Sequence, residues 1–260
     1  ASTGVLVTTV TPWTTSTGDV SFVEFQYASG EVKVVACDGV RLITIDTSNV
    51  VVTGSDVDMP TPMQPYLVYL DGYIFLVKAG TSDIYNSNLD SPLVFTSGDF
   101  ITAEMAPDEL VRIDRTRNYI VAFGTQSIEY FYDAANASGS PLNRNDTPFK
   151  QVGYLGGLAR YESKIYFVGQ SDGAASNPEV YMIEDFKMEE TSVPPLRRFM
   201  QPNSLFKGAI ISQGGYDFYV VNSGDITYAM ELSKGIWTRW AFKAQTTFPV
   251  KYSVALIRTG

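Results

Sequence analysis

The densest group of side chains that could perform acid–base chemistry is a set of carboxylates near the middle of the chain. Glu104 lies just before Pro107-Asp108-Glu109. Two neighbouring carboxyl groups can differ in pKa, and such a pair serves glycoside hydrolysis as acid and base. The same residues are typical of a turn, because proline fixes φ and aspartate bonds the backbone. We expect a turn here, ahead of a strand over Leu110–Asp114, and no catalytic role.

Three other patterns point to binding chemistry only weakly. Asp56 and Asp58 could contact Ca²⁺, but no EF-hand spacing with a distal glutamate follows them. Ser171-Asp172-Gly173 is similar to the start of a sialidase Asp-box, without the closing aromatic residue. Gly153-Tyr-Leu-Gly156-Gly157 lacks the lysine and the following helix of a phosphate loop. We predict no metal site, no cofactor and no catalytic residue.

The absence of histidine and the presence of only one cysteine further limit the residues available for catalysis. The chain has no histidine, which excludes Ser-His-Asp and Cys-His catalysis and removes the usual zinc ligands. It has one cysteine, so no internal disulfide can form. We expect Cys37 to be a small buried side chain just before a turn at Asp38-Gly39. Any catalysis would have to rest on carboxylates, tyrosines or lysines, and we expect that the protein is not an enzyme.

Tryptophan is the residue that could stack on sugar rings. Trp13, Trp237 and Trp240 are the candidates. Trp237 and Trp240 are an odd number of residues apart, so on a strand they face opposite ways, and at least one should lie in the core. A carbohydrate- or receptor-binding protein would instead gather exposed aromatic side chains at one end of its channel.

The charge balance argues against nucleic acid as a direct ligand. Asp and Glu number 28 against 19 Lys and Arg, for a net charge of −9, and the only adjacent basic pair is Arg197-Arg198. A protein that grips DNA needs a basic face. No apolar run approaches the roughly 20 residues of a membrane helix. We expect neither direct DNA affinity nor a membrane partner.

A unit of three predicted strands recurs along the 260 residues, so strands must position the side chains discussed above. Its clearest copy has strands over Leu110–Asp114, Tyr119–Phe123 and Ser127–Tyr132. Taking the residue before the middle strand of each copy gives spacings of 41, 46, 46 and 53 residues, at Glu31, Gly72, Asn118, Lys164 and Asp217. Four-stranded propeller blades repeat every 40 to 50 residues or so.

A fourth, outer strand should follow each unit. The candidates are Val50–Thr53, Leu93–Thr96, Phe149–Val152, Leu196–Met200 and Trp237–Phe242. Residues 134–145 and 171–177 are expected to be exposed loops, because they are rich in Asn, Ser, Gly and Asp. The best helix signal, Ala103–Leu110, is interrupted by Pro107.

The fold indicated is all-β, a β-propeller of roughly six four-stranded blades. The middle strands are apolar on both faces, as expected when each sheet is covered by a neighbour on either side. Tyr252–Ile257 and Val5–Thr11 would together supply a sixth unit and close the ring, which leaves no exposed sheet edges between blades. The alternative is an irregular β-sandwich. We expect one propeller domain over residues 1–260.

Between Tyr73 and Val152 the sequence resembles a known family. The matching elements are Ile84-Tyr85-Asn86-Ser87-Asn88-Leu89 with Ser91-Pro92, then Phe100-Ile-Thr-Ala103-Glu104 with Pro107-Asp108, then Phe123-Gly124-Thr125 with Ser127-Ile128-Glu129-Tyr130-Phe131, and Thr147-Pro148-Phe149 with Gly153. In this order they resemble the packaged-DNA stabilisation proteins, the tail stabilisation or hub proteins of short-tailed bacteriophages.

The resemblance implies a structural component of a phage tail, located in the virion and made in the cytoplasm of the bacterial host. Such a protein forms a homo-oligomeric hub or adaptor ring below the portal, helps to retain packaged DNA and attaches distal tail parts. Its partners would be portal or adaptor proteins and tail needle or fibre proteins. Members of the family are usually larger, so we expect a piece of a longer tail protein. The alternative function is a carbohydrate- or receptor-binding β-propeller, and a propeller glycosidase or lyase is the third.

Overall fold

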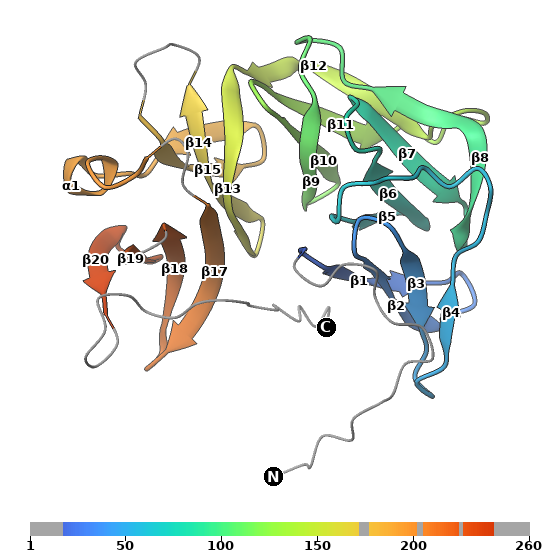
Figure 1. Ribbon diagram of the computed structural model, residues 1–260, viewed down its shortest axis with the longest axis horizontal. Coiled ribbons are helices and arrows are strands. Elements are labelled where there is room, and N and C mark those ends of the chain that lie inside the picture. Colours follow the sequence, from blue (N-terminus) through green and yellow to red (C-terminus); the bar gives the residue numbers. More distant parts are fainter. Residues whose placement is uncertain (1–17, 172–176, 202–204, 224–225, 242–260) are drawn as a thin grey trace. The chain divides into compact units, whose positions relative to one another are not determined.

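The protein is built almost entirely of β-strands (Figure 1). The computed structural model describes residues 18–171, 177–201, 205–223 and 226–241. Two compact units can be distinguished, Ala1–Gly124 with Glu129–Phe149, and Thr125–Ile128 with Lys150–Gly260. Among the described residues no helix has the length and hydrophobicity needed to cross a membrane.

The first unit contains three four-stranded antiparallel sheets, each a meander in which strands neighbouring in sequence pair. The first sheet comprises β1 (Ser21–Gln26), β2 (Val32–Cys37), β3 (Leu42–Ile45) and β4 (Val51–Thr53). The second comprises β5 (Val68–Leu70), β6 (Tyr73–Val77), β7 (Asp83–Asn88) and β8 (Ser91–Thr102). The third comprises β9 (Leu110–Thr116), β10 (Tyr119–Gly124), β11 (Ile128–Asp133) and β12 (Leu142–Lys150).

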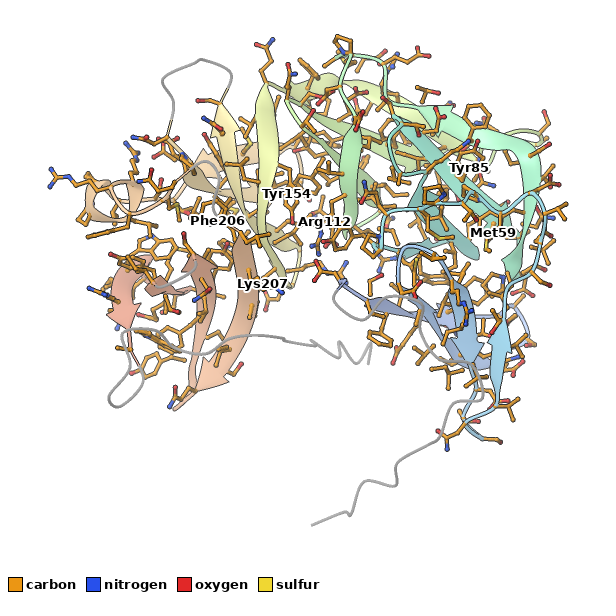
Figure 2. All side chains as sticks on the ribbon, viewed as in Figure 1. Met59, Tyr85, Arg112, Tyr154, Phe206 and Lys207 are labelled. Atoms are coloured by element: carbon orange, nitrogen blue, oxygen red, sulfur yellow. The ribbon has the colours of Figure 1, made fainter. Side chains whose placement is uncertain are left out.

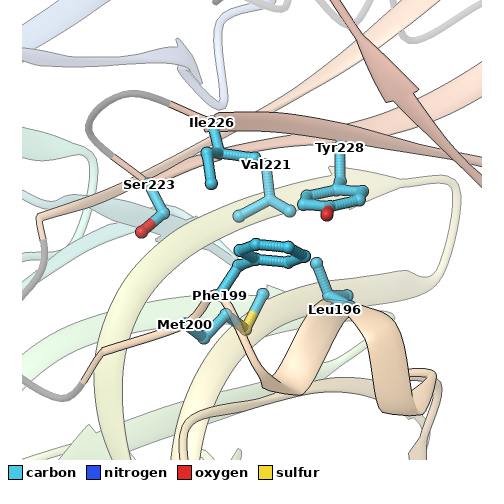
Figure 3. A pocket seen from close by; sticks show the side chains of 7 residues that line it. All are labelled: Leu196, Phe199, Met200, Val221, Ser223, Ile226 and Tyr228. Atoms are coloured by element: carbon cyan, nitrogen blue, oxygen red, sulfur yellow. The ribbon is translucent and has the colours of Figure 1, made fainter.

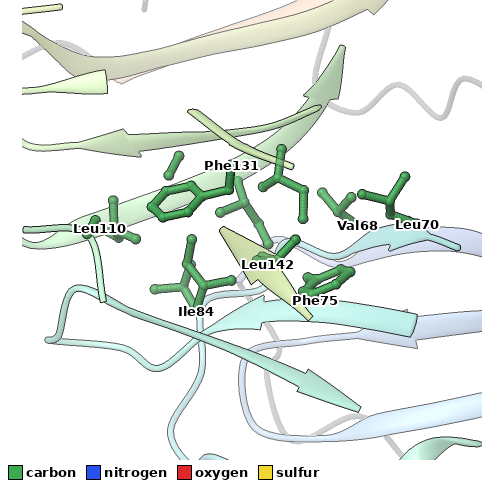
Figure 4. Packing of buried hydrophobic residues seen from close by; sticks show 12 residues of the cluster. Val68, Leu70, Phe75, Ile84, Leu110, Phe131 and Leu142 are labelled. Carbon is green, nitrogen blue, oxygen red and sulfur yellow. The ribbon is translucent and has the colours of Figure 1, made fainter. Parts of the chain in front are cut away.

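Strand β6 is buried on both faces, and alternate side chains enter two different cores. Ile74 and Leu76 pack into the core shared with the first sheet. Phe75 and Val77 pack into the core shared with the third sheet, which also holds Phe131 (Figure 4). Successive side chains of a strand point to opposite faces, so an uninterrupted apolar run serves two neighbours at once.

Polar contacts also join the first strands of these three sheets. The Tyr69 hydroxyl donates to the carbonyl oxygen of Gln26 at 3.0 Å, and Arg115 Nη1 donates to the carbonyl oxygen of Tyr69 at 2.8 Å. The Arg112 guanidinium, labelled in Figure 2, lies 4.1 Å from the centre of the Tyr66 ring. Hydrogen bonds and a cation–π contact therefore fix each first strand against the next.

The second unit contains two further meanders. One comprises β13 (Val152–Tyr161), β14 (Lys164–Ser171), β15 (Glu179–Glu184) and β16 (Lys187–Glu190), and the other comprises β17 (Phe206–Gln213), β18 (Tyr216–Ser223), β19 (Ile226–Glu231) and β20 (Ile236–Trp240). A parallel pairing of Gly156 with Phe206 joins them into one eight-stranded sheet. The helix α1 (Pro194–Arg197) lies between β16 and β17 in the sequence.

Glycine is required where these two first strands meet. A Cβ on Gly208 would overlap the backbone of Gly157, and one on Gly156 would lie 2.7 Å from the carbonyl oxygen of Phe206. The Tyr219 hydroxyl donates to the Gly157 carbonyl oxygen at 2.7 Å. The glycine pair at 156–157 therefore permits two backbones to approach closely, which agrees with the expectation that it is no phosphate loop.

The three strands of the clearest repeat occur where the sequence predicted them, as Leu110–Thr116, Tyr119–Gly124 and Ile128–Asp133. Gly72 and Asn118 directly precede the second strands of their sheets and Lys164 begins its own, so the three positions are equivalent. Five side chains of the middle strands, which their apolar pattern predicts to be mostly buried, are completely buried: Phe75, Ile120, Phe123, Ile165 and Phe167.

Two of the five outer strands differ from the prediction. The outer strand of the third sheet is Leu142–Lys150, not Phe149–Val152, and Val152 instead begins β13. The expected loop over 134–145 therefore ends earlier. The outer strand of the fourth meander is Lys187–Glu190, a charged segment without the apolar alternation of a strand.

The helix signals were also misplaced. Leu196–Met200, expected as a strand, overlaps α1, in which proline occupies the first turn and Leu196 is buried. Proline is favoured there because its missing N–H needs no partner. Ala103–Leu110 is not helical. The segments proposed for a sixth unit, Val5–Thr11 and Tyr252–Ile257, lie outside the described residues, and the single domain over 1–260 stays a prediction.

Replacing Gly208 by alanine should lower the free energy of unfolding by at least about 2 kcal/mol, because the added methyl group forces two paired backbones apart. Urea unfolding followed by tryptophan fluorescence measures this. Gly98→Ala is the matched control, since a Cβ there meets nothing within 4 Å. Equal effects of the two substitutions would contradict the close approach of β13 and β17.

Candidate functional site

The predicted carboxylate cluster lies on the connection between β8 and β9, which is pinned to a neighbouring turn. The backbone amides of Ala103 and Leu110 donate to the carbonyl oxygens of Ser82 and Thr81, at 2.9 and 3.0 Å. The Ser82 hydroxyl donates to the carbonyl oxygen of Asp108 at 2.7 Å. The connection is thus a fixed turn, as the sequence indicated.

Asp108 and Glu104 occupy different environments within this turn. The Asp108 side chain is buried, and its carboxylate fills the space beside Gly124, where a Cβ would overlap it. The Glu104 side chain is 68% exposed. One carboxylate is packed against the backbone and the other lies in solvent, so they do not form a matched acid–base pair.

Sequence reasoning missed the carboxylate at the centre of this cluster, Glu129 on β11. Its side chain is 1% exposed, and its Oε1 accepts the backbone N–H of Met105 at 3.0 Å. Burial raises the pKa of Glu129, while the amide of Met105 and the charge of Arg144 act in the opposite direction. The only sequence signal was an acidic residue inside an otherwise apolar strand.

Arg144 on β12 completes the cluster. Its Nη1 lies 3.9 Å from both Glu104 Oε2 and Glu129 Oε2, and its Nε donates to Asp146 Oδ1 at 2.9 Å. The guanidinium therefore links a buried carboxylate to two exposed ones. The buried Glu129 carboxylate, which faces Arg144 and accepts backbone N–H groups of the connection, therefore holds residues 103–109 against β11 and β12.

The other predicted positions have structural roles where they are described. Cys37 is completely buried, and burial raises its pKa to about 12. The Asp38 carboxylate accepts the backbone N–H groups of Val40 and Arg41, which forms the expected turn. Asp56 accepts the N–H of Asp58 at 2.9 Å. The described residues contain no group of three or more candidate metal ligands. Asp172 and Gly173 lie outside them, as does Trp13.

The two described tryptophans face opposite sides of β20, as expected. Trp237 packs against the core of the second unit and donates through Nε1 to the carbonyl oxygen of Thr191 at 2.7 Å. Trp240 lies edge-on to Phe218, with ring centroids 5.1 Å apart. Trp237 is thus the core member of the pair.

Exposed aromatic side chains are spread over the described part of the chain. They lie on β1, β8, β11, the segment after α1, and β18, at Phe22, Phe100, Tyr132, Phe199 and Tyr216. Each comes from a different element, and within the described ranges no ring contact joins two of them. The aromatic cluster required for a carbohydrate or receptor site is not formed by these residues.

An apolar pocket lies between α1 and strands β18 and β19 (Figure 3). Leu196, Phe199 and Met200 face Val221, Ile226 and Tyr228 across it, with Ser223 at its margin. Its volume is about 10 Å³, room for one water molecule, whereas pockets for small ligands measure about 300 Å³ or more. It is a packing defect under the helix.

A second hollow, of about 450 Å³, is polar and open to solvent on β14 to β16. Lys164 lies 3.8 Å from Glu184, and Lys187 is paired with Glu189. Asp185 is a third carboxylate in the lining, so two lysines and three carboxylates leave a net charge of only −1 with which to hold an ion.

Comparison with known proteins identifies the fold. A family model of phage stabilisation proteins, described as bacteriophage P22 Gp10, beta-propeller, matches residues 4–202. No curated protein matches the chain.

Three solved structures are similar to the chain over most of its length. Selenomethionine-substituted virginiamycin B lyase from Staphylococcus aureus has a TM-score of 0.56 at 12% identity, covering 90% of this chain and 74% of the lyase. A catalytically inactive histidine-to-alanine variant of that lyase with quinupristin has a TM-score of 0.52 at 12% identity, covering 89% and 73%. A streptogramin B lyase has a TM-score of 0.50 at 16% identity, covering 84% and 67%.

At such identities these likenesses concern the fold alone. Together with the family model they show an all-β propeller, as the repeats predicted, rather than a β-sandwich.

The buried carboxylate predicts how stability responds to pH. Because burial raises the pKa of Glu129, its ionised form destabilises the folded protein above that pKa, and the cost disappears as the pH falls to the unfolded value of about 4.3. Glu129→Gln removes this dependence and keeps an acceptor for Met105. The unfolding free energy of the wild type relative to Glu129→Gln should therefore rise as the pH is lowered from about 7 to about 4.

Urea unfolding of both proteins across this pH range tests the prediction. Glu104→Gln is the control, because it removes an exposed carboxylate at the same 3.9 Å from Arg144 and should change the unfolding free energy by less than about 1 kcal/mol at every pH. A wild-type advantage over Glu129→Gln that shrinks on acidification would contradict the assignment.

Proposed function

The chain belongs to the phage stabilisation family of β-propellers, and from this membership we propose that it is a structural component of a phage tail. In the proposal it forms part of a hub or adaptor ring below the portal, helps to retain packaged DNA and attaches distal tail parts. It does so as one propeller domain within a homo-oligomeric ring, in contact with portal or adaptor proteins and with needle or fibre proteins.

The family match over residues 4–202 carries this proposal. The three candidate sites among the described residues are consistent with this proposal. The carboxylate cluster holds a connection in place, and the apolar pocket has room for about one water molecule. Four of the five charged side chains that line the polar hollow are paired with one another. A protein of this construction acts through its surfaces, by contact with neighbours.

The likeness to lyases does not extend to their chemistry. One of the similar structures is a lyase made catalytically inactive by replacing a histidine with alanine. The present chain has no histidine anywhere. The same fold hosts many functions, and the residue whose loss inactivates that lyase has no counterpart of its type here.

Electrostatics supports containment of DNA without gripping it. Acidic residues exceed basic ones by nine. Seven basic side chains are engaged in ion pairs with carboxylates, namely Lys33, Arg112, Arg144, Lys164, Lys187, Arg197 and Lys234. A wall of this kind repels phosphates, so DNA can pass during ejection, whereas a basic wall would release counterions and bind it.

Deletion of the gene from its phage tests the structural role. Particles made without the protein should package DNA and then lose it, which is measured as DNase-sensitive DNA after packaging. Supplying the protein from a plasmid should restore retention, and mass spectrometry of purified virions should find the chain in the particle. Particles that keep their DNA and infect normally without the protein would overturn the proposal.

The isolated protein should show no measurable binding to duplex DNA at about physiological salt, because a net charge of −9 with one adjacent basic pair, Arg197-Arg198, predicts no basic face to displace counterions. Fluorescence anisotropy with a labelled duplex, repeated at several salt concentrations, is the measurement. Micromolar affinity that falls steeply with added salt would contradict this expectation and would show that the fold concentrates its basic residues.

A further inference from the structure

The outer strand of the first sheet, β4, differs from the other four outer strands of the described residues. It reads Val51-Val52-Thr53, follows Val50, and carries neither a charged residue nor a proline. Each of the others carries at least one, at Pro92 and Asp99 on β8, Arg144, Asp146, Pro148 and Lys150 on β12, Lys187, Glu189 and Glu190 on β16, and Arg239 on β20. Charges and prolines on edge strands prevent pairing with other chains.

The hydrogen bonds of β4 show which of its backbone groups remain available. The Asp46 N–H donates to the Val50 carbonyl oxygen at 3.1 Å, and the Gly54 N–H to the Leu42 carbonyl oxygen at 2.8 Å. Hydrogen-bonded pairs alternate along an antiparallel ladder, so Val52, opposite Thr44, also bonds to β3. The N–H and C=O groups of Val51 and Thr53 therefore point away from β3, along the open edge.

The side chains beside this edge are apolar and accessible. Val50 is 55% exposed and Val52 is 50% exposed, and the two lie on one face of the strand. Val57, a few residues further along the chain, is 95% exposed. An incoming strand would thus find hydrogen-bonding groups and aliphatic surface together, the combination used in β-strand addition.

We propose that β4 is a docking edge that pairs with an extended, uncharged strand of a neighbouring protein in the phage tail. The inference rests on the proposed function, because that function supplies the neighbour. Val51 and Thr53 provide the backbone hydrogen bonds, and Val50 and Val52 cover β-branched or other apolar side chains of the added strand.

Charge and symmetry favour a different protein over a second copy of this chain. Two copies pairing through β4 in antiparallel fashion would form a closed two-fold dimer, which is not the interface of a larger ring. The net charge of −9 on each copy also opposes pairing of two copies through this edge, which has no basic side chain to offset the repulsion. The edge offers no charged side chain with which a charged strand could pair, so it fits a strand without charges.

Val51→Pro tests the edge, because it removes the outward N–H of Val51 and leaves the bonds of Val50 and Val52 to β3. The purified variant should unfold within about 3 °C of the wild type. In a gene-deleted phage complemented with Val51→Pro, incorporation of the protein into particles should fall by about fivefold or more.

Met188→Pro is the matched control on a charged edge. The Thr191 N–H donates to the Val180 carbonyl oxygen, so Glu189 and Lys187 bond to β15 and the N–H of Met188 points outward. This variant should be incorporated as well as the wild type. Equal loss for both variants, or no loss for Val51→Pro, would overturn the proposal.

Hydrogen exchange of the Val51 and Thr53 amides identifies the occupant. Exchange should be fast in the isolated full chain and slow in purified virions. Slow exchange in the isolated monomer would assign the edge to another part of this chain, and slow exchange only on self-association would assign it to a second copy; either result refutes the proposal. Gene deletion that releases DNA while Val51→Pro particles match the wild type would refute the docking edge and leave the tail role intact.

Discussion

Burial of the inner sheets on both faces, as at β6, is the constraint on which the rest of the structure depends. In β6, Ile74 and Leu76 pack into one core and Phe75 and Val77 into another. A sheet of this kind is not stable alone, because removing either neighbour exposes a row of aliphatic and aromatic side chains to water. The repeat therefore has to continue from sheet to sheet, which explains why the chain consists of meanders in series. The glycines of β13 and β17 meet the same demand at the first strands, where two backbones come too close for a Cβ.

The same constraint restricts the differences between sheets to their outer strands and connections. Middle strands must be apolar on both sides, so β6, β10 and β14 are nearly interchangeable and carry no information about a partner. Outer strands and connections face water and are free to differ. They hold the buried Glu129–Arg144 contact beneath the 103–109 connection, the short helix between β16 and β17, and the uncharged edge of β4. A fold shared with lyases can thus serve a phage particle, because function is determined in these segments.

Prediction from the sequence succeeded for the middle strands and was less accurate for the outer strands and connections. Middle strands such as Tyr119–Phe123 were located to within a residue, because continuous apolar runs bounded by turns have few alternative interpretations. Outer strands failed where their residues lack that pattern: Lys187–Glu190 is almost wholly charged, and Leu142–Lys150 begins in a polar segment. Leu196–Met200 has the apolar content of a strand, yet Pro194-Pro195 begins a helix there. Glu129 was missed because burial depends on the neighbouring strand β12 and on the 103–109 connection, which sequence spacing does not bring together.

Charge pairing connects the fold to the proposed role. A basic side chain that is paired with a carboxylate of the protein is less available to bind an external phosphate. Arg144, for example, faces three carboxylates. The ion pairs on exposed strands contribute little to stability, since solvent screens them and ordering long side chains costs entropy. Their larger consequence is electrostatic. Intramolecular pairing cancels equal numbers of positive and negative charges, so the chain keeps its net charge of −9. In the proposed role, a surface of that sign would interact unfavourably with DNA of any sequence. Under the proposed function, a hub that retains packaged DNA and later lets it pass would need contacts with proteins at its edges and repulsion of nucleic acid elsewhere. The uncharged edge of β4 in a chain of net charge −9 would combine the two.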